Sequence, residues 1–398
     1  MDIKIYPNKL TGTVSAIPSK SQAHRLLICA AFSDKPTELI CPQTNQDIEA
    51  TANCLNAIGA KISRTESGYS VVPITIVPDT AQLDCCESGS TLRFLLPVVC
   101  ALGIDATIHM SGRLPYRPLS PLWEELERMG CCLSRPTDTT IQTSGKLKNG
   151  DYTIAGNVSS QYITGLLFAL SLLDGNSKIH VTGKLESEPY VRMTQNALAM
   201  FGVDTTDSEL HGNYPFCSPG SIYVEGDWSN AAFFLAAKAL GSRIIVDNLN
   251  ADSAQGDRKV AEILARSDTN PTISVADIPD LVPILAVYFA AKNGATFTDI
   301  GRLRLKESDR VASVCNMLES LGIRTMSDEN CMTVHCGKIT GGIVDACNDH
   351  RIAMAAAIAS TVANGPVTVL GAECVAKSYP TFWQEFKRLG GKYEQYIR

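Results

Sequence analysis

The feature that most constrains the fold is a helix ending that recurs along the chain. Each copy places two apolar residues three positions apart, follows them at once with glycine, and continues into a strand-like segment. Glycine is typical of the first residue beyond a helix, because the left-handed backbone conformation adopted there suits it best. The copies end at Gly59, Gly130, Gly202, Gly322 and Gly390, and a degenerate copy without glycine runs from Ile263 to Asp268.

The spacing of these copies indicates repeated folding units. They lie roughly 55–75 residues apart, which is longer than the usual solenoid repeats. Six such units fill the 398 residues, and each combines helix and strand, so the pattern predicts an α/β fold. The alternative is that a common helix ending has recurred by chance. A domain boundary is expected at Gly226-Asp227, before an apolar helix over Ala231–Leu240.

A second set of positions marks helix starts. Serine, aspartate and asparagine precede apolar-periodic segments, and such side chains accept hydrogen bonds from the free N–H groups of a first helical turn. The same helix ends suit phosphate and carboxylate ligands, although capping alone explains most of them. The segments are Ser19-Lys-Ser21, Ser88-Gly-Ser90, Ser159-Ser-Gln161, Asp227-Trp-Ser229, Ser308-Asp309 and Asn348-Asp349.

Composition excludes several classes of protein. With 45% apolar and 19% charged residues, the chain has the composition of an ordinary globular protein. Its net charge of −6 argues against general nucleic-acid binding, and its longest apolar runs are too short to span a bilayer. Met1 begins a strand-like segment rather than a signal peptide. We therefore expect a cytoplasmic protein, and a monomer.

Cysteine and histidine spacing predicts neither a metal site nor a disulfide framework. The 14 cysteines include the adjacent pairs Cys85-Cys86 and Cys131-Cys132, and no Cys-x-x-Cys spacing occurs. The six histidines form no His-x-x-x-His pair. We expect buried, reduced thiols and no metal. A Gly-x-x-x-x-Gly-Lys-Ser/Thr loop is also absent from the sequence, which disfavours a nucleotide-binding enzyme.

The segment 301–310, Gly-Arg-Leu-Arg-Leu-Lys-Glu-Ser-Asp-Arg, carries the densest cluster of cations. On a strand, the alternation would place Arg302, Arg304 and Lys306 on one face and the two leucines on the other. A helix capped by Ser308 or Asp309 would follow. A helix N-terminus is already positive, so cations there make sense if an anion binds. A solvated basic edge with local ion pairs is the alternative.

A further basic helix start, Ile17-Pro-Ser-Lys-Ser-Gln-Ala-His-Arg25, resembles the first signature of the 5-enolpyruvylshikimate-3-phosphate synthase family. Related signatures follow in family order as far as residue 377, so the resemblance covers nearly the whole chain. They are Glu87-Ser-Gly89-Ser-Thr-Leu-Arg93, Gly112-Arg-Leu-Pro-Tyr-Arg117, Gly156-Asn-Val-Ser159-Ser160-Gln161, Ser187-Glu-Pro-Tyr190, Lys306-Glu-Ser-Asp-Arg310, Asn348-Asp-His-Arg351 and Cys374-Val-Ala-Lys377.

The chain departs from the family pattern at several positions. Glu87 stands where asparagine is commoner, Phe94 where many members have proline, and Arg302 where many carry asparagine. Gly89, which leaves room for a ligand to approach the backbone, is retained. Glyphosate occupies the phosphoenolpyruvate site in this family, and we expect Gly89 to permit its binding and Phe94 to weaken it.

The resemblance implies a set of binding residues. Shikimate 3-phosphate would be bound by Lys20, Ser21, Arg25, Ser159, Ser160, Gln161, Ser187, Tyr190, Asp280, Arg302 and Lys306. Phosphoenolpyruvate would be bound by Lys20, Glu87, Gly89, Arg117, Gln161, Arg310, Arg351 and Lys377. Arginine suits planar carboxylate and phosphate contacts, and lysine acts as a point charge. No metal or organic cofactor is implied.

Two acids receive catalytic roles. Asp280 precedes the apolar run 281–291, where it could be a base with a raised pKa or simply the N-cap of a helix. The resemblance implies that Asp280 accepts a proton from the acceptor hydroxyl, that Glu307 protonates a carbon of phosphoenolpyruvate, and that Lys20 gives electrostatic support. The reaction would be enolpyruvyl transfer by addition and elimination through a tetrahedral intermediate.

The fold that the resemblance implies is an inside-out α/β barrel of two domains, built from six βαβαββ-like repeats. One domain, 17–227, would be inserted into the other, 1–16 plus 228–398, with the active site in the cleft between them. Two alternatives are the sister transferase that acts on UDP-N-acetylglucosamine and a phosphate-binding relative without activity. The Val-Ser-Ser-Gln segment disfavours the first, and the presence of Lys20, Asp280 and Glu307 disfavours the second.

Overall fold

The computed structural model describes residues 1–205, 210–266 and 268–396, and the chain divides into two compact units. Unit 1 comprises Met1–Ile17 and Glu225–Arg398, and unit 2 comprises Pro18–Val224. Each unit has its own hydrophobic core, built largely from helices that are apolar on all sides and from the inner faces of the strands.

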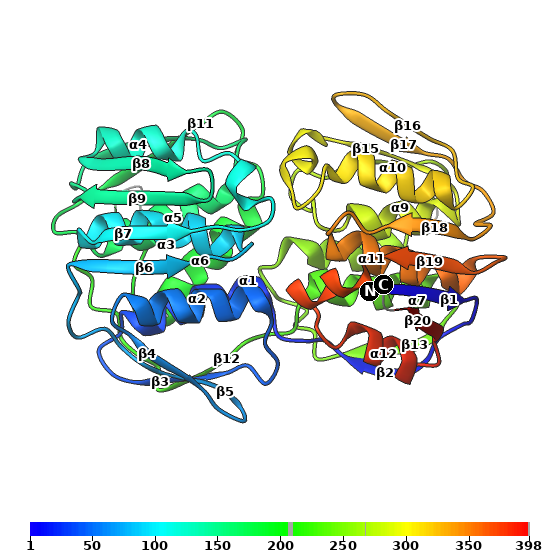
Figure 1. The fold of residues 1–398 in the computed structure, drawn as a ribbon, viewed down its shortest axis with the longest axis horizontal. Helices are drawn as coiled ribbons and strands as arrows, with labels where there is room; N and C mark the ends of the chain where they lie inside the picture. Colours follow the sequence, from blue (N-terminus) through cyan, green and yellow to red (C-terminus); the bar gives the residue numbers. More distant parts are fainter. Residues whose placement is uncertain (206–209, 267, 397–398) are drawn as a thin grey trace. The chain divides into compact units, whose positions relative to one another are not determined.

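One arrangement of strands and helices recurs six times within the described residues (Figure 1). Each repeat has two parallel strands and two helices, and in four of the six repeats the first helix joins the two strands directly. In the other two repeats, the paired strands are far apart in the sequence. In four repeats, two further antiparallel strands complete a four-stranded sheet, whereas the other two repeats have a two-stranded parallel sheet. The strand order of each four-stranded sheet is the same, for example β6-β7-β9-β8 and β14-β15-β17-β16.

Unit 2 contains three sheets and six α-helices among its described residues. Its strands are β3 (Thr37–Ile40), β4 (Lys61–Arg64), β5 (Gly68–Val72) and β12 (Ser221–Tyr223) in the first sheet, β6 (Thr80–Asp84), β7 (Asp105–His109), β8 (Cys131–Thr137) and β9 (Thr140–Gly145) in the second, and β10 (Asp151–Ala155) and β11 (Lys178–Thr182) in the third. Its helices are α1 (Lys20–Ala31), α2 (Gln46–Ala57), α3 (Gly89–Leu102), α4 (Leu122–Arg128), α5 (Ser160–Ser171) and α6 (Glu188–Met200), with the 3₁₀ turn η1 (Leu114–Tyr116).

Unit 1 repeats this arrangement with the first strands of the chain included. Its strands are β14 (Thr272–Ser274), β15 (Ala295–Thr298), β16 (Thr325–Ser327) and β17 (Cys331–Val334), then β18 (Gly342–Asp345), β19 (Val367–Leu370), β1 (Asp2–Tyr6) and β20 (Lys392–Tyr396), and the pair β2 (Thr11–Ser15) and β13 (Arg243–Asp247). Its helices are α7 (Trp228–Ala239), α8 (Val260–Leu264), α9 (Val282–Ala290), α10 (Arg310–Ser320), α11 (His350–Ala359) and α12 (Phe382–Arg388), with the 3₁₀ segments η2 (Gly256–Lys259), η3 (Gly301–Leu305), η4 (Ser360–Val362) and η5 (Ala372–Lys377).

The predicted helix endings coincide with these repeats. The five glycines follow α2, α4, α6, α10 and α12, each the second helix of a repeat, and all five have positive φ. The sixth copy falls at α8, although its Ser267 lies outside the described residues. The prediction of six repeated units from this ending is therefore confirmed, and in five of them its physical basis is the glycine with positive φ that follows the second helix.

The predicted helix starts are also confirmed. Ser19, Ser88, Ser159, Asp227 and Asp349 cap the first helices of five repeats, and each side chain accepts a backbone N–H from the first turn. Asp309 caps α10 in the same way. The first helices carry the core: all nine residues of α9 are buried, and α7, α9 and α11 pack against one another in unit 1.

The expectation of buried thiols holds for only part of the set. All fourteen cysteines are free, and eight of them are buried. Six others are exposed or partly exposed because they lie in loops or at strand ends: Cys86, Cys132, Cys217, Cys331, Cys336 and Cys347. Among the described residues, no helix has both the length and the apolar character needed to cross a membrane.

Candidate active site

The candidate residues of unit 2 lie at the starts of its helices. Lys20 is the first residue of α1, and its Nζ lies 2.8 Å from Asp47 Oδ2 at the start of α2. Ser21 follows Lys20, Gly89 begins α3, and Ser160 begins α5. Free N–H groups of helix ends thus occur beside a cation, as an anion-binding surface requires.

Arg25 is a buried cation held by neutral groups. Only 2% of it is exposed. Its Nε donates to Thr194 Oγ1 at 2.8 Å, Nη1 to Ser21 O at 2.6 Å, and Nη2 to Tyr190 O at 3.0 Å. Its guanidinium also stacks 5.0 Å from the centre of the Phe94 ring. Burial lowers the pKa of Arg25 to about 10, so the group remains charged at neutral pH and can attract an anion.

Phe94, which was expected to weaken glyphosate binding, is a core residue whose ring lies against the Arg25 guanidinium. It is 1% exposed and makes an edge contact with Phe168.

Gly89 lies against two arginines. A Cβ atom added to it would approach Arg93 Nη1 to 2.6 Å and Arg117 Nη1 to 2.7 Å. Arg93 Nη1 donates to Gln161 Oε1 at 3.2 Å, and Gln161 Nε2 donates to Ser90 Oγ at 3.0 Å. The starts of α3 and α5 and the loop that carries Arg117 are therefore brought together. Because Gly89 has no side chain, a planar anion has room to approach these two guanidinium groups.

The remaining predicted residues of unit 2 frame this region. Ser159 caps α5, Ser160 and Ser187 are buried, and Tyr190 lies in the first turn of α6. The Glu87 carboxyl lies against the backbone of Gly112, where an added Cβ would be 2.4 Å from Glu87 Cδ.

The cation-rich segment of unit 1 does not form the predicted strand. Residues Gly301–Leu305 form the 3₁₀ helix η3, in which the Leu303 N–H donates to Ile300 O. A 3₁₀ helix has three residues per turn, so the alternating cations and leucines do not lie on two opposite faces. Accordingly, Leu303 is 1% exposed, whereas Leu305 is 45% exposed. Arg304 lies 3.5 Å from Asp309, whereas Lys306 lies 3.8 Å from Asp280. The predicted face of three cations is thus wrong.

Arg310 is the centre of the charged group in unit 1. It is 0% exposed, and each of its three nitrogens donates to a different carboxylate. The distances are 3.0 Å from Nε to Asp349 Oδ2, 2.8 Å from Nη1 to Asp280 Oδ1, and 2.6 Å from Nη2 to Glu307 Oε2. Burial works against the charge, but Asp349, Glu307 and Asp280 outweigh it and raise the pKa of Arg310. The guanidinium therefore fixes the positions of three acids.

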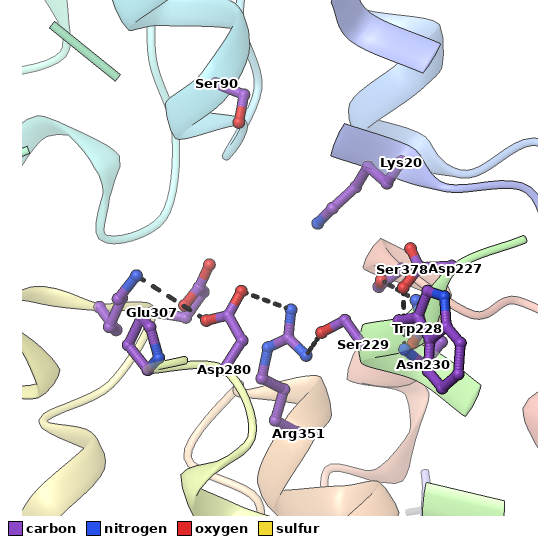
Figure 2. A network of polar contacts seen from close by, with 12 residues as sticks. Lys20, Ser90, Asp227, Trp228, Ser229, Asn230, Asp280, Glu307, Arg351 and Ser378 are labelled. Carbon is purple, nitrogen blue, oxygen red and sulfur yellow. Dashed lines mark hydrogen bonds and ion pairs between the residues drawn. The ribbon is translucent and has the colours of Figure 1, made fainter. Parts of the chain in front are cut away.

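Asp280 bridges two arginines. Its Oδ1 accepts from Arg310 Nη1. Its Oδ2 accepts from Arg351 Nη2 at 2.8 Å, as Figure 2 shows. Lys306 Nζ lies 3.8 Å from the same carboxylate. Its N-cap interpretation is wrong, because α9 has Leu281 at its N-cap position and no side-chain cap. Burial raises the pKa of Asp280, but Arg351, Lys306 and Arg310 together hold it well below the usual range.

The other predicted residues of unit 1 adjoin this group. Arg351 Nη1 donates to Ser229 Oγ at 2.6 Å (Figure 2). Lys377 Nζ donates to Asn348 O at 3.1 Å. Burial lowers the pKa of Lys306 to about 8, against the opposing effect of Asp280, and Arg302 lowers it further. Arg302 therefore lies close enough to Lys306 to repel its charge.

Several residues at these sites were missed in the sequence. Ser229 and Asp349 were identified only as parts of helix starts, yet Ser229 also accepts from Arg351, and Asp349 also accepts from Arg310. Asp47, which pairs with Lys20, lies at the start of α2. This helix is capped by an asparagine, and no motif in the sequence identified its start. Ser90 was identified only as part of a helix start and of a signature.

The chemistry available to unit 1 is proton transfer beside bound anions. The side chains of Asp280 and Glu307 are 20% and 26% exposed, whereas that of Arg310 is fully buried. The two acids are thus held by the buried Arg310 guanidinium and remain reachable from solvent, as a general acid or base must be. Among residues 1–205, 210–266 and 268–396, no group of three or more histidine, cysteine or acidic side chains is arranged to hold a metal ion.

Comparison with known proteins links the chain to one family. The family model described as EPSP synthase (3-phosphoshikimate 1-carboxyvinyltransferase) matches residues 5–386. A 3-phosphoshikimate 1-carboxyvinyltransferase of Clostridium beijerinckii is 38% identical over 431 residues, covering 99% of each chain. The enzyme of the same name from Clostridium kluyveri is also 38% identical, over 99% of this chain and 98% of its own.

Solved structures with a similar fold include an EPSP synthase from Acinetobacter baumannii. It has a TM-score of 0.80 and 24% identity, and the match covers 99% of this chain and 100% of that one. The enolpyruvyl transferase NikO from Streptomyces tendae has a TM-score of 0.76 at 17% identity, over 99% and 98% of the two chains. The expected enolpyruvyl transferase fold is therefore confirmed.

Proposed function

The chain belongs to the EPSP synthase (3-phosphoshikimate 1-carboxyvinyltransferase) family, and we propose how its residues carry out the reaction. The enzyme transfers the enolpyruvyl group of phosphoenolpyruvate to the 5-hydroxyl of shikimate 3-phosphate and releases phosphate. The observation that supports the residue roles best is the group around Arg310, where two reachable acids are fixed beside Arg351 and Lys306.

The first step is addition. Asp280 accepts the proton of the 5-hydroxyl as its oxygen attacks C2 of phosphoenolpyruvate, while Glu307 delivers a proton to C3. The tetrahedral intermediate then loses a proton from C3 and the phosphate group, which restores the double bond. Lys20 supports the developing negative charge. Each general acid or base is expected to contribute about 10²–10⁴-fold.

The cations divide between the two substrates. Arg25 and Lys306 bind shikimate 3-phosphate together with Ser159, Ser160 and Gln161. Arg117, Arg310, Arg351 and Lys377 bind phosphoenolpyruvate, with Gly89 giving it access to the arginines. Catalysis then requires that residues of both units act on the same pair of substrates. One copy of the chain supplies every group named, so we propose a monomer, acting in the cytoplasm.

Substitution of Gly89 by alanine is expected to weaken phosphoenolpyruvate binding. The new methyl group would displace the Arg93 and Arg117 guanidinium groups, which it would otherwise approach within 2.7 Å. KM for phosphoenolpyruvate should rise by between about 10-fold and 100-fold, since a shift of about 1 Å in a positioning group can cost about 100-fold. The matched control is Gly301→Ala, whose Cβ meets nothing within 4 Å. Equal KM values for the two variants would contradict the placement.

The affinity for shikimate 3-phosphate is expected to fall as pH rises through the Lys306 pKa of about 8. In the free enzyme, Lys306 loses its proton above this pH and no longer attracts the substrate phosphate. kcat/KM should decline there while kcat stays flatter, because bound phosphate stabilises the charged form. The variant Lys306→Arg keeps its charge and should lack the decline. If kcat/KM of Lys306→Arg declined by the same amount, the titration would belong to a group other than Lys306.

Calorimetry tests the assignment of residues to substrates. Shikimate 3-phosphate should bind alone, and glyphosate should bind only when it is present. Arg25→Met should weaken the first event, whereas Arg351→Met should weaken mainly the second. Thermal unfolding of each variant shows whether it remains folded. Loss of both events to the same degree in the two folded variants would contradict the division.

A further inference from the structure

Four buried side chains of unit 2 form a hydrogen-bonded network that no step above uses. His24 Nδ1 lies 2.7 Å from Thr51 Oγ1, which lies 2.7 Å from Thr91 Oγ1. Thr91 Oγ1 in turn donates to Ser88 Oγ at 2.7 Å. His24 belongs to α1, Thr51 to α2 and Thr91 to α3, and all four residues are 0% exposed. This group, called the His24 network below, therefore joins three helices within the core.

One end of the His24 network reaches residues of the candidate site. Ser88 caps α3 directly before Gly89, and its Oγ also accepts the Thr91 N–H at 3.2 Å. Thr91 Oγ1 lies 3.4 Å from Asp47 O as well, and the Asp47 carboxylate pairs with Lys20 Nζ at 2.8 Å. The Thr91 hydroxyl thus contacts two helix starts, one that carries Gly89 and one that carries the partner of Lys20.

The direction of these hydrogen bonds follows from the number of protons, since each hydroxyl has only one. The Thr91 proton is directed to Ser88, so Thr91 Oγ1 accepts from Thr51 at the other contact. Because Thr51 has then used its own proton, its Oγ1 must accept from the imidazole. His24 therefore carries a proton on Nδ1 and is the donor at the beginning of the network.

The surroundings of the imidazole support a neutral ring. Its Nε2 is buried and has no hydrogen-bond partner among the described residues, and the ring makes an edge contact with Phe94 at 6.3 Å between centres. A proton on Nε2 would be a buried donor without an acceptor, which folded proteins rarely contain. Burial, with smaller contributions from the charges of Lys20 and Arg25, lowers the pKa of His24 well below its usual value.

We propose that His24 is a positioning residue that, through the hydroxyls of Thr51 and Thr91, fixes the start of α3 relative to the start of α2. Without the Nδ1–H donor, the Thr51 hydroxyl is free to rotate and no longer holds that of Thr91. A shift between the two helix starts would move the Lys20 ammonium relative to the arginines beside Gly89. The roles of Lys20 and Gly89, on which this inference rests, are those of the proposed function.

The first test measures KM for phosphoenolpyruvate in His24→Phe and His24→Asn. Phenylalanine keeps a ring but has no donor, whereas asparagine places an amide N–H near the position of Nδ1. His24→Phe should raise KM by about 10-fold or more, since a shift of about 1 Å in a positioning group can cost about 100-fold. His24→Asn should recover most of that loss. A merely structural role would lower the folded fraction, and with it the apparent kcat, but would leave KM unchanged.

The control for these variants is Thr143→Val. It removes a buried hydroxyl of the same unit that accepts the Ala106 N–H at 3.1 Å and donates to Ile104 O at 3.0 Å. Its KM for phosphoenolpyruvate should equal that of the wild type. An unchanged KM in folded His24→Phe, or an equal rise in Thr143→Val, would overturn the inference.

The second test is a double-mutant cycle between His24→Phe and Thr91→Val. If the His24 network acts as one unit, breaking it at two places costs little more than breaking it once. KM of the double variant should therefore lie within about twofold of that of the more impaired single variant. The pair His24→Phe and Thr143→Val should instead show independent effects that multiply. Independent effects in the first pair would overturn the inference.

The closing experiment is NMR of the imidazole nitrogens in wild-type enzyme, with the His24 signals assigned through their NOE to the Phe94 ring. We expect a proton on Nδ1 and none on Nε2 at neutral pH. A proton on Nε2 in place of Nδ1 would overturn the inference, because Thr51 would then donate to the imidazole and not to Thr91. This measurement covers the case in which the variants fail to fold. Folded enzyme without turnover would contradict the residue roles proposed above, whereas the NMR spectrum would still report on His24.

Discussion

Asp280→Asn is expected to lower kcat by about 100-fold or more, since a general base contributes about 10²–10⁴-fold. Asparagine cannot accept the hydroxyl proton. Its NH₂ group would also face a guanidinium donor, because the two carboxylate oxygens now accept from Arg310 and Arg351. The measurement is phosphate release at saturating concentrations of both substrates. Glu307→Gln should lose at least about tenfold for the corresponding reason at C3.

The control for Asp280→Asn is Asp277→Asn, which removes another carboxylate of the same segment. The Asp277 carboxylate pairs with Lys259. This substitution should leave kcat within about twofold, as expected for an exposed ion pair. Binding of shikimate 3-phosphate, measured by calorimetry, should survive in Asp280→Asn. A kcat of Asp280→Asn within twofold of the wild type would remove Asp280 from the base role.

The base role proposed for Asp280 requires that its carboxylate become more basic when substrates bind. In the free chain, burial raises its pKa, but Arg351, Lys306 and Arg310 outweigh burial and hold the carboxylate ionised and weakly basic. Substrate phosphate and carboxylate groups that pair with these cations would weaken that hold, so the pKa of Asp280 should rise in the complex. The proposed base would therefore be activated by the substrates themselves.

Arg310→Met is expected to cost about 3–5 kcal/mol of unfolding free energy at neutral pH, the usual cost of removing one partner from a buried ion pair. Asp280, Glu307 and Asp349 would be left close together without the guanidinium that now separates them. Their mutual repulsion would raise their pKa values, so the folded variant would bind more protons than its unfolded chain. Its stability deficit should therefore shrink as pH falls from about 7 to about 5.

Urea denaturation of Arg310→Met and a control measures this cost. The control Arg304→Met removes an arginine that is 37% exposed and lies 3.5 Å from Asp309. It should cost less than about 1 kcal/mol, as surface ion pairs do. Similar losses in the two variants would mean that Arg310 is not the anchor of the acidic residues.

The repeats could be predicted from sequence because their signals are local. Glycine readily adopts the positive φ that ends a helix, and a serine or aspartate cap acts on N–H groups two or three residues away. Both signals need only neighbouring residues. The segment Gly301–Leu305 was misread for the same reason: its alternation suggested a strand, but packing of Leu303 into the core together with Ile300 favoured a 3₁₀ turn.

Long-range partners could not be predicted from local pattern. Asp280 looked like a helix cap, and its partners Arg310 and Arg351 lie 30 and 71 residues further along the chain. The resemblance to a family identified the cations, whereas only the structure showed which acids hold them.

The most direct test of the central claim is phosphate release from phosphoenolpyruvate with each acceptor in turn. With shikimate 3-phosphate, the account predicts release of one phosphate for each enol ether formed, as quantified by mass spectrometry. With UDP-N-acetylglucosamine, it predicts no release above the rate without acceptor. Absence of shikimate 3-phosphate-dependent release from folded enzyme, or equal release with both acceptors, would contradict it.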